Sequence, residues 1–432
     1  MELNQLLNHD IACSCGRIHR CDIDLVDIGR GALERLPESM KNFENILLVA
    51  DSNTYAVCGK RVRALLGDKI KNICLFVTDD MLVHDELLVP DEAAIAAVEG
   101  KMSAETALIL GIGSGVINDV CKYVSFYKNI KCGIIATAPS MDGFASSGAA
   151  MILGGMKVTA TTHAPAIIVG DTEILKNAPA DMIRSGYADI IGKYSALNDW
   201  KLSHLINGEY LCREVYDLVL EKTNLIRSLA KDIAARKDDA IEELMRDLVL
   251  IGVTLTLLST TRPGSGSEHH LSHYFEITGL VEDKPYFLHG TDVGYSTIVT
   301  ARLREEIRAI KSPEFLSISD EVREKCYEKI YGRISPEVSE LQKRAGRYAN
   351  PVNDVYRAKW SEVVEILNEC PTADEIGEML TDCGFDLSLF EQMYGAKKIR
   401  NGIWFGKDLK DRYSVLWLYF NLFFRESEAE AI

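Results

Sequence analysis

The sequence predicts an α/β protein of two domains: an N-terminal domain with a parallel sheet, residues 1–171, and an all-helical C-terminal domain, residues 172–432. Two patterns carry this prediction. Over the first 170 or so residues, short apolar runs alternate with segments of helical spacing, as in parallel sheets whose strands are buried on both faces. From about residue 172 onward, long amphipathic stretches replace the runs, and these are typical of packed helices.

Five apolar runs are the expected strands of the sheet. Val57–Leu66 and Ala93–Val98, which lie between runs, have the three- and four-residue apolar spacing of helices. Strands joined by such helices pair in parallel, because the connection returns the chain to the same edge of the sheet. The five runs are Ile46–Ala50, Cys74–Val77, Leu108–Leu110, Gly133–Ala136 and Ala166–Val169.

The C-terminal half is expected to be helical. Glu209–Ala235 and Ala240–Thr256 place apolar residues three and four apart, with charged residues between them. The apolar stretch Leu248–Thr261 is shorter than the roughly 20 residues of a membrane span, so it predicts a buried helix. We expect no membrane span, and we expect ligands to bind in a cleft between the two domains.

Composition narrows the class of function. The chain has 432 residues, with 48 lysines and arginines against 64 aspartates and glutamates, and a net charge of −16. Nucleic acids and anionic membranes require a basic surface, so we expect neither as a partner. An anionic substrate would need a local cation or a helix N-terminus. Eleven cysteines and an N-terminus without a secretory pattern predict reduced thiols and a cytoplasmic protein.

A group of cysteines near the N-terminus, Cys13, Cys15 and Cys21, surrounds His19 in the sequence. The C-x-C spacing is tighter than the two to four intervening residues that are usual in structural zinc sites. We therefore expect a short β-hairpin with reduced thiols at this place, rather than a zinc site.

A glycine-rich turn follows the third expected strand. Gly111, Gly113 and Gly115 lie between that strand and an expected helix, Val116–Tyr123. Glycines let the backbone approach a pyrophosphate closely, and a helix N-terminus stabilises its charge. The pattern is GxGxG rather than the full dinucleotide fingerprint, and the strand-end acid, Asp51, precedes the glycines instead of following them. The residues alone leave a plain tight turn as the alternative.

Histidines gather in one short stretch of the chain. His269 and His273 are expected to share one face of a helix that begins at the serines after Pro263. His289 follows, just ahead of Thr291, which could cap another helix. Imidazoles at this spacing favour a metal site, and the alternative is a set of core or solvated histidines.

A carboxylate is needed to complete such a site. Asp189 lies in an otherwise apolar helical segment, where an aspartate needs a partner. Two imidazoles and a carboxylate would make a three-ligand metal site with open positions for a substrate. The alternative partner is Lys193, one turn further on, in a surface ion pair.

Five stretches occur in an order that resembles the glycerol-1-phosphate dehydrogenases, most closely their bacterial branch. That family is grouped with glycerol dehydrogenases, iron-type alcohol dehydrogenases and dehydroquinate synthases, and the resemblance implies their Rossmann-like N-terminal domain. It extends from about Ile46 to Gly294, with a fainter echo at Asp411–Tyr413. The stretches are GSGVINDVCKY, TAPSMDGFASSGA, SGYADIIGKYSALNDW, SGSEHHLSHYFE and LHGTDVGY.

The resemblance implies a role for each matching position. Asp189, His269 and His289 would bind one divalent metal, zinc or nickel, with Asp189 also on the substrate side. Asp142 and His273 would be the catalytic and substrate-binding residues near the nicotinamide. The positions implied for NAD(H), or for NADP(H), are Asp51 at the adenosine ribose, Gly113, Ser114, Gly115, Val116 and Ile117 at the pyrophosphate, and Thr137, Ala138, Pro139, Ser140 and Ser146 along the cofactor path.

The substrate phosphate needs a positive partner in this acidic chain. Lys157, at a position comparable to a substrate-binding lysine of the dehydroquinate synthases, is the first candidate, and Arg262 is the second. The alternative for Lys157 is a solvated lysine in a loop.

The implied reaction is the reduction of dihydroxyacetone phosphate by NADH or NADPH to sn-glycerol 1-phosphate. The metal would polarise the ketone, and His273, or a water that it orients, would supply the proton. The family implies a homodimer or a larger homo-oligomer. The alternatives are a polyol dehydrogenase acting on unphosphorylated glycerol, a cyclase like dehydroquinate synthase, and a silent NAD-binding protein. The cyclases have a glutamate near the position of Asp189, and a silent protein would be expected to lack a metal ligand.

Overall fold

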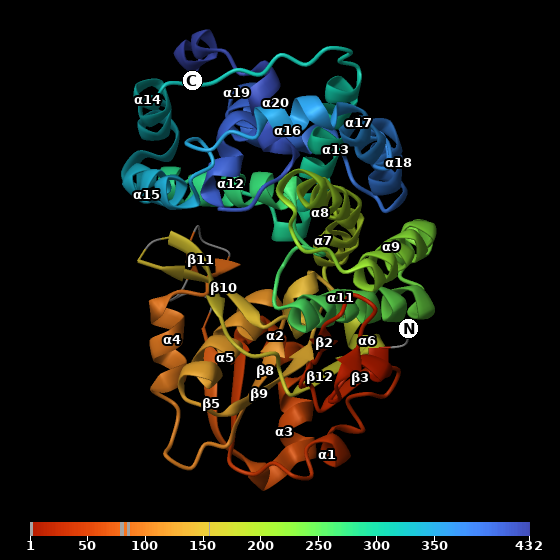
Figure 1. Cartoon of the computed structure of the whole chain (residues 1–432). Helices are drawn as coiled ribbons and strands as arrows, with labels where there is room; N and C mark the ends of the chain where they lie inside the picture. The colour runs from red at the N-terminus through yellow and green to blue at the C-terminus, as the bar shows by residue number, and fades with distance from the viewer. Residues whose placement is uncertain (1–2, 78–81, 84–86, 155) are drawn as a thin grey trace. The chain divides into compact units, whose positions relative to one another are not determined.

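The computed structural model describes residues 3–77, 82–83, 87–154 and 156–432 (Figure 1). The chain divides into two compact units. The first consists of Met1–Ile190 and Ser228–Thr261, and the second of Ile191–Arg227 and Arg262–Ile432. The boundary expected between residues 171 and 172, which divides a nucleotide-binding domain from a metal- and substrate-binding domain, stays a prediction.

A six-stranded parallel sheet forms the centre of the first unit. Its strands lie in the order β3-β12-β9-β8-β4-β5, and every neighbouring pair is parallel. Each of the five expected runs overlaps one of these strands, with Val77 and Ala166 just outside β5 and β12, so the predicted α/β class is confirmed. The bounds are β3 Leu25–Gly29, β4 Ile46–Asp51, β5 Ile70–Phe76, β8 Leu108–Gly113, β9 Lys131–Ala136 and β12 Ile167–Asp171.

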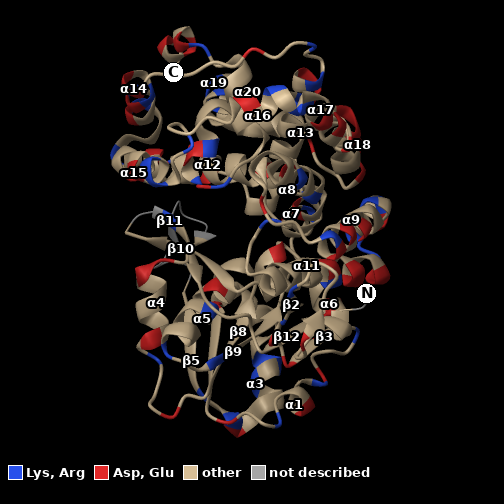
Figure 2. Cartoon of the chain, in the orientation of Figure 1, with Lys and Arg blue, Asp and Glu red and all other residues tan. Residues whose placement is uncertain are grey.

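Apolar side chains on both faces of the central strands build the core of this unit. Leu48 of β4 and Leu110 of β8 are fully buried, and they share one cluster with Val62 and Leu36. These two residues belong to helices α3 (Lys60–Leu66) and α1 (Leu36–Ser39). Figure 2 shows that charged residues gather on outer helices such as α3 and leave β8 without any.

The strand order reverses between β4 and β8. From β4 the chain moves to β5 at one edge, whereas from β8 it moves through β9 to β12 on the other side. In open parallel sheets, ligands bind at the carboxyl ends of the strands that flank such a switch point. Asp51 ends β4 and Gly113 ends β8, so these two residues flank it.

The first unit also contains hairpins and helices outside the central sheet. The N-terminal hairpin of β1 (Ile11–Ala12) and β2 (Ile18–His19) confirms the expected one. A longer hairpin consists of β10 (Gly148–Leu153) and β11 (Met156–Thr161). The helices are α4 Glu92–Glu99, α5 Gly115–Tyr127, α6 Thr172–Leu175, α7 Ala180–Ile191, whose last residue belongs to the second unit, α10 Ala230–Ala234 and α11 Asp238–Leu258.

The buried helix expected from Leu248 onward is the second half of α11. Leu248 and Val249 are fully buried, and the helix ends at Leu258. Among the described residues, no helix combines the length and the apolar character needed to cross a membrane.

The second unit is helical in its regular structure, over the residues described. Leu202, Ile307, Val363 and Trp417 belong to its apolar core. The stretch expected as one helix at Glu209–Ala235 is instead interrupted at Leu229, so that α9 is followed by the short α10. The helices are α8 Lys193–Asn207, α9 Arg213–Ser228, α12 Ser267–Glu282, α13 His289–Arg308, α14 Asp320–Tyr331, α15 Ser335–Ala345, α16 Asn353–Ala358, α17 Trp360–Leu367, α18 Ala373–Asp382, α19 Ser388–Phe405 and α20 Val415–Phe423.

Candidate functional site

Asp51 is held at the end of β4 by a reciprocal helix cap. Its Oδ1 accepts a hydrogen bond from Thr54 N at 2.7 Å, and its N donates to Thr54 Oγ1 at 3.1 Å. This capping box starts the short helix α2 (Ser52–Thr54) and orients the carboxylate at the switch point. The hydrogen bond to Oδ1 fixes the orientation of the whole carboxylate, including Oδ2.

The glycine turn joins β8 directly to α5. A Cβ at Gly113 would lie 2.6 Å from Ile117 Cγ1 and 2.7 Å from Ile117 Cβ, too close for any other residue without a shift. Close packing of a strand against the following helix is one of the reasons that glycine recurs in nucleotide-binding turns. The first N–H groups of α5, which begins at Gly115, have no partner inside the helix and lie at the carboxyl edge of the sheet.

The segment after β9 lies against this turn. Thr137 N donates to Gly113 O at 3.0 Å, and the hydroxyls of Ser114 and Ser140 share a hydrogen bond. Thr137, Ala138, Pro139 and Ser140 are all buried. The structure therefore brings together the pyrophosphate and cofactor-path positions expected from the sequence.

Lys122 of α5, which sequence reasoning missed, anchors the far end of the same segment. Its Nζ donates to Gly143 O at 3.0 Å and to Ser146 Oγ at 3.3 Å, and it pairs with Asp119 Oδ1 at 2.9 Å. The lysine side chain is fully buried. A lysine in the apolar pattern of an expected helix is the signal that could have indicated it.

Two helix glycines let the backbone of this segment approach α7 and α11. A Cβ at Gly186 of α7 would lie 1.9 Å from Pro139 O, and one at Gly252 of α11 would lie 2.7 Å from Asp142 O. Only hydrogen fits at either position without moving the backbone. Both glycines therefore help to place Asp142.

Asp189 and Asp142 lie together in the first unit. Asp189 Oδ2 accepts a hydrogen bond from Asp142 N at 2.9 Å, and the Asp189 side chain is fully buried. The surface ion pair considered for Asp189 and Lys193 is wrong, because both residues are fully buried. Within the second unit, Lys193 Nζ donates to Gly264 O at 2.9 Å.

Three histidines form a cluster in the second unit. The ring centroids of His269 and His289 are 5.0 Å apart, those of His273 and His289 are 5.4 Å apart, and those of His269 and His273 are 6.2 Å apart. His269 and His273 lie one turn apart on α12, as expected, and His289 begins α13. Thr291 does not cap that helix, because its N-cap residue is Leu288.

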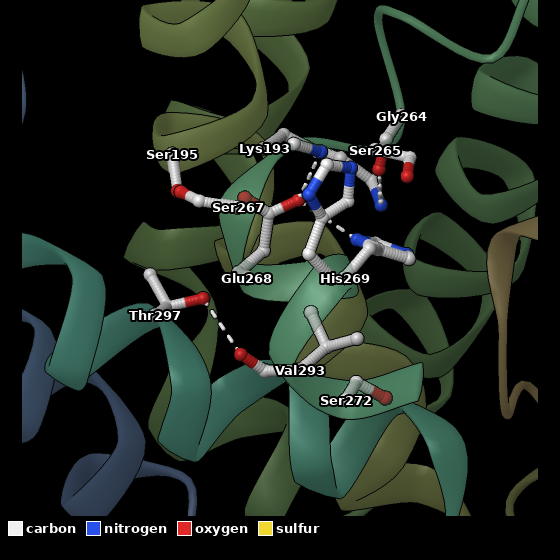
Figure 3. A network of polar contacts seen from close by, with 12 residues as sticks. Lys193, Ser195, Gly264, Ser265, Ser267, Glu268, His269, Ser272, Val293 and Thr297 are labelled. Carbon is white, nitrogen blue, oxygen red and sulfur yellow. Dashed lines mark hydrogen bonds and ion pairs between the residues drawn. The ribbon is translucent and has the colours of Figure 1, made fainter. Parts of the chain in front are cut away.

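Glu268 orients His269, and sequence reasoning missed it. Glu268 Oε1 lies 2.8 Å from His269 Nδ1, and its side chain is fully buried (Figure 3). Because a carboxylate only accepts, Nδ1 carries the proton and Nε2 carries the lone pair of the ring. Burial raises the pKa of Glu268, but hydrogen bonds with His269, Ser195 and Gly266 lower it more, so the carboxyl stays ionised.

Buried carboxylates, rather than the expected serines, cap the start of α12. Gly266 N donates to Glu268 Oε1 at 2.6 Å, and Ser267 N donates to Asp199 Oδ2 at 2.6 Å. A Cβ at Gly266 would lie 2.7 Å from Asp199 Oδ2, so glycine is required there. Arg304 pairs with Asp199 Oδ1 at 2.8 Å, although burial still raises the pKa of Asp199.

The two candidates for phosphate binding have different surroundings. Lys157 lies on β11, opposite Ile152 of β10, and is half-buried. It is therefore in a strand and not in a loop. Arg262 is buried, with its Nε donating to Glu209 Oε1 at 2.6 Å and its Nη1 to Tyr413 O at 2.7 Å. These contacts give Arg262 a structural role, which leaves Lys157 as the candidate.

Two solved structures of enzymes have a similar fold. Glycerol dehydrogenase from Schizosaccharomyces pombe matches with a TM-score of 0.52 at 17% identity, over 87% of this chain and 92% of its own. A 1,3-propanediol oxidoreductase matches with a TM-score of 0.57 at 12% identity, over 92% of this chain and 97% of its own. The sequence model of iron-containing alcohol dehydrogenases matches residues 27–179. The fold is thus shared with these two enzymes, and the match to iron-containing alcohol dehydrogenases covers part of the first unit.

Curated relatives narrow this class. A glycerol-1-phosphate dehydrogenase [NAD(P)+] of Halalkalibacterium halodurans is 35% identical over 303 residues, which are 68% of this chain and 75% of the relative. One of Bacillus licheniformis is 31% identical over 346 residues, 79% of this chain and 84% of the relative. The chain belongs to the glycerol-1-phosphate dehydrogenase family and is an oxidoreductase. The resemblance inferred from the five stretches is confirmed.

Proposed function

We propose that this protein reduces dihydroxyacetone phosphate to sn-glycerol 1-phosphate, with NADH or NADPH as hydride donor and a divalent metal at Asp189, His269 and His289. The names of the relatives support the substrate and the cofactor. The observation that carries the proposal for this chain is the histidine cluster, in which a buried carboxylate fixes the ring of His269.

The donor set fits a divalent metal. Ligand atoms of His269 and His289 lie within 4.8 Å of each other, and Asp189 adds a carboxylate. A carboxylate on the far nitrogen of a ligating histidine, as Glu268 provides, is a recurrent feature of metal centres. Two imidazoles and one carboxylate suit zinc, nickel or ferrous iron. When bound, the metal is a Lewis acid that polarises the ketone.

The switch point of the sheet fits a dinucleotide. Asp51 Oδ2 would accept a hydrogen bond from a ribose hydroxyl, while Oδ1 stays on the cap of α2. The pyrophosphate would bind at Gly113–Ile117, where the first N–H groups of α5 admit an anion and Gly113 lets Ile117 pack closely against β8. Thr137–Ser140 would continue the path toward the nicotinamide.

The remaining residues act on the substrate. His273 lies in the cluster and supplies the proton that the oxygen of the reduced ketone needs. Asp142, whose backbone is held by Gly252 and by Asp189, orients a substrate hydroxyl. Lys157 binds the phosphate dianion in a chain whose net charge is −16.

The oxidation of NADH or NADPH with dihydroxyacetone phosphate, compared with dihydroxyacetone, tests the proposal. We expect turnover of the phosphorylated substrate only, with sn-glycerol 1-phosphate as the product in a stereospecific assay. Equal turnover of dihydroxyacetone would favour the polyol dehydrogenase, and formation of the 3-phosphate enantiomer would also contradict the proposal. The absence of NADH and NADPH oxidation with either substrate would favour the cyclase or the silent protein.

A further inference from the structure

We propose that the N-terminal hairpin binds a zinc ion through Cys13, Cys15 and His19, at a site separate from the histidine cluster. The two Sγ atoms and one ring nitrogen of His19 all lie within 4.8 Å of one another. Cys15 Sγ is 3.3 Å from His19 Nε2. In a tetrahedral zinc site with Zn–S of about 2.3 Å and Zn–N of about 2.0–2.1 Å, sulfur and nitrogen ligands lie about 3.5 Å apart. The observed separation is close to that value.

The turn of the hairpin explains how the short spacing still gathers the ligands. Gly16 N donates to Cys13 O at 3.0 Å, and Cys13 N donates to Arg17 O at 3.1 Å. Gly16 has a φ of 82°, which allows the chain to reverse directly after the second cysteine. The third ligand then comes from the returning strand, because His19 pairs with Ile11 across the hairpin. The argument against zinc from the sequence used only the spacing of the two cysteines, although His19 was part of the group considered.

A hydrogen bond prepares His19 as a ligand. Its Nδ1 lies 3.0 Å from Leu257 O, and its side chain is buried. The Leu257 carbonyl lies in the last turn of α11, where carbonyls lack partners inside the helix. Because a carbonyl only accepts, Nδ1 carries the proton and Nε2 carries the lone pair directed at Cys15. This backbone contact is a common way of fixing a metal-bound imidazole.

The charges of the group also suit zinc. Two thiolates and a neutral imidazole neutralise a divalent cation, so a half-buried site of this kind carries no net charge. None of the 11 cysteines forms a disulfide, so both thiols are reduced, as metal binding requires. A water or a further side chain would complete the tetrahedron. The competing explanation is a plain S–H···N hydrogen bond between Cys15 and His19.

Cobalt substitution separates the two explanations on the full-length protein. Cobalt(II) bound by thiolates has an intense near-ultraviolet charge-transfer absorption, which the oxygen and nitrogen ligands of the histidine cluster cannot give. We expect this absorption in the wild-type protein and its loss in the double variant Cys13→Ser/Cys15→Ser, with zinc content falling by one equivalent per chain. His9→Ala, at an exposed histidine of the same segment, is the matched control and should change neither.

A second measurement needs no variant. Zinc should slow alkylation of Cys13 and Cys15 by iodoacetamide at least tenfold, as followed by peptide mass spectrometry. Unchanged alkylation with zinc, or a wild-type cobalt form without thiolate absorption, would overturn the proposal. Neither readout involves the reduction of a ketone, so the hairpin site and the proposed function succeed or fail separately.

Discussion

Among single residues, Glu268 is expected to affect metal affinity through its contact with His269. Its buried carboxylate holds the ring of His269, so Glu268→Gln should keep the volume but weaken the hold on the ligand. We expect metal affinity to fall about 10- to 100-fold, the usual effect of losing such a partner. Competition with a chelator measures it. Glu282→Gln, on the same helix but paired with the exposed Lys284 and the half-buried Lys398, is the control. Unchanged affinity in Glu268→Gln would show that the carboxylate does not support a metal ligand.

Asp51 should set the choice between NADH and NADPH. A carboxylate there accepts from the ribose 2′-hydroxyl and repels a 2′-phosphate, so we expect a preference for NADH. Asp51→Asn removes the charge but keeps the cap of α2, because asparagine caps helices as well as aspartate does. The ratio of kcat/KM for NADH to kcat/KM for NADPH should fall about tenfold, equivalent to about 1.4 kcal/mol. A wild-type enzyme that uses both cofactors equally would contradict this placement of Asp51.

Lys157 should act on the substrate alone. Lys157→Ala removes the cation proposed for the phosphate, so the KM for dihydroxyacetone phosphate should rise at least tenfold while that for NADH stays within twofold. Steady-state kinetics with each substrate varied in turn measures both. Lys71→Ala, at an exposed lysine of β5, serves as the control. An equal rise of both constants would assign Lys157 to the structure rather than to the phosphate.

At the scale of elements, the packing of α7 on the Thr137–Ser146 segment depends on Gly186. Alanine stabilises a helix interior by up to about 1 kcal/mol over glycine, but here its Cβ would lie 1.9 Å from a backbone oxygen. Overpacking of this kind costs roughly 1–3 kcal/mol, so the clash should prevail. Urea unfolding should show that Gly186→Ala lowers the free energy of unfolding. The control is Gly377→Ala in α18, where the added Cβ would meet only the flexible side chain of Leu387, and it should be neutral or stabilising. A stable Gly186→Ala would mean that the two backbones do not approach so closely.

Elements were predictable where burial imposes a pattern. The interior strands β4, β8, β9 and β12 are apolar along nearly their whole length, and each was expected from its composition. The edge strand β3 was not, because Asp27 interrupts it and forms a pair with Arg35 at 2.6 Å. The start of α12 was predicted without its true cap, since the carboxylate of Asp199 comes from a distant helix that no local signal indicates.

At the scale of the whole molecule, order along the chain carried more information than composition. The five stretches predicted the family, whereas the groups that support the site residues, such as Lys122 and Glu268, lie inside those stretches without a distinguishing pattern. Lys122 has its role through a long-range contact with Gly143, and Glu268 through a contact with the adjacent His269. Both contacts are visible only in three dimensions. The homo-oligomer and the cytoplasmic location expected from the sequence stay predictions.

The central claim is that a metal held by His269 and His289 is required for the reaction. The most direct test measures bound metal and the rate of NADH oxidation in His269→Ala and His289→Ala, prepared in the Cys13→Ser/Cys15→Ser background so that thiolate-bound zinc does not contribute. His204→Ala, at an exposed histidine of the second unit, is the control. The account predicts that both variants lose the metal and the activity together while the control keeps both. Stoichiometric metal in both variants, or activity without metal, would contradict it.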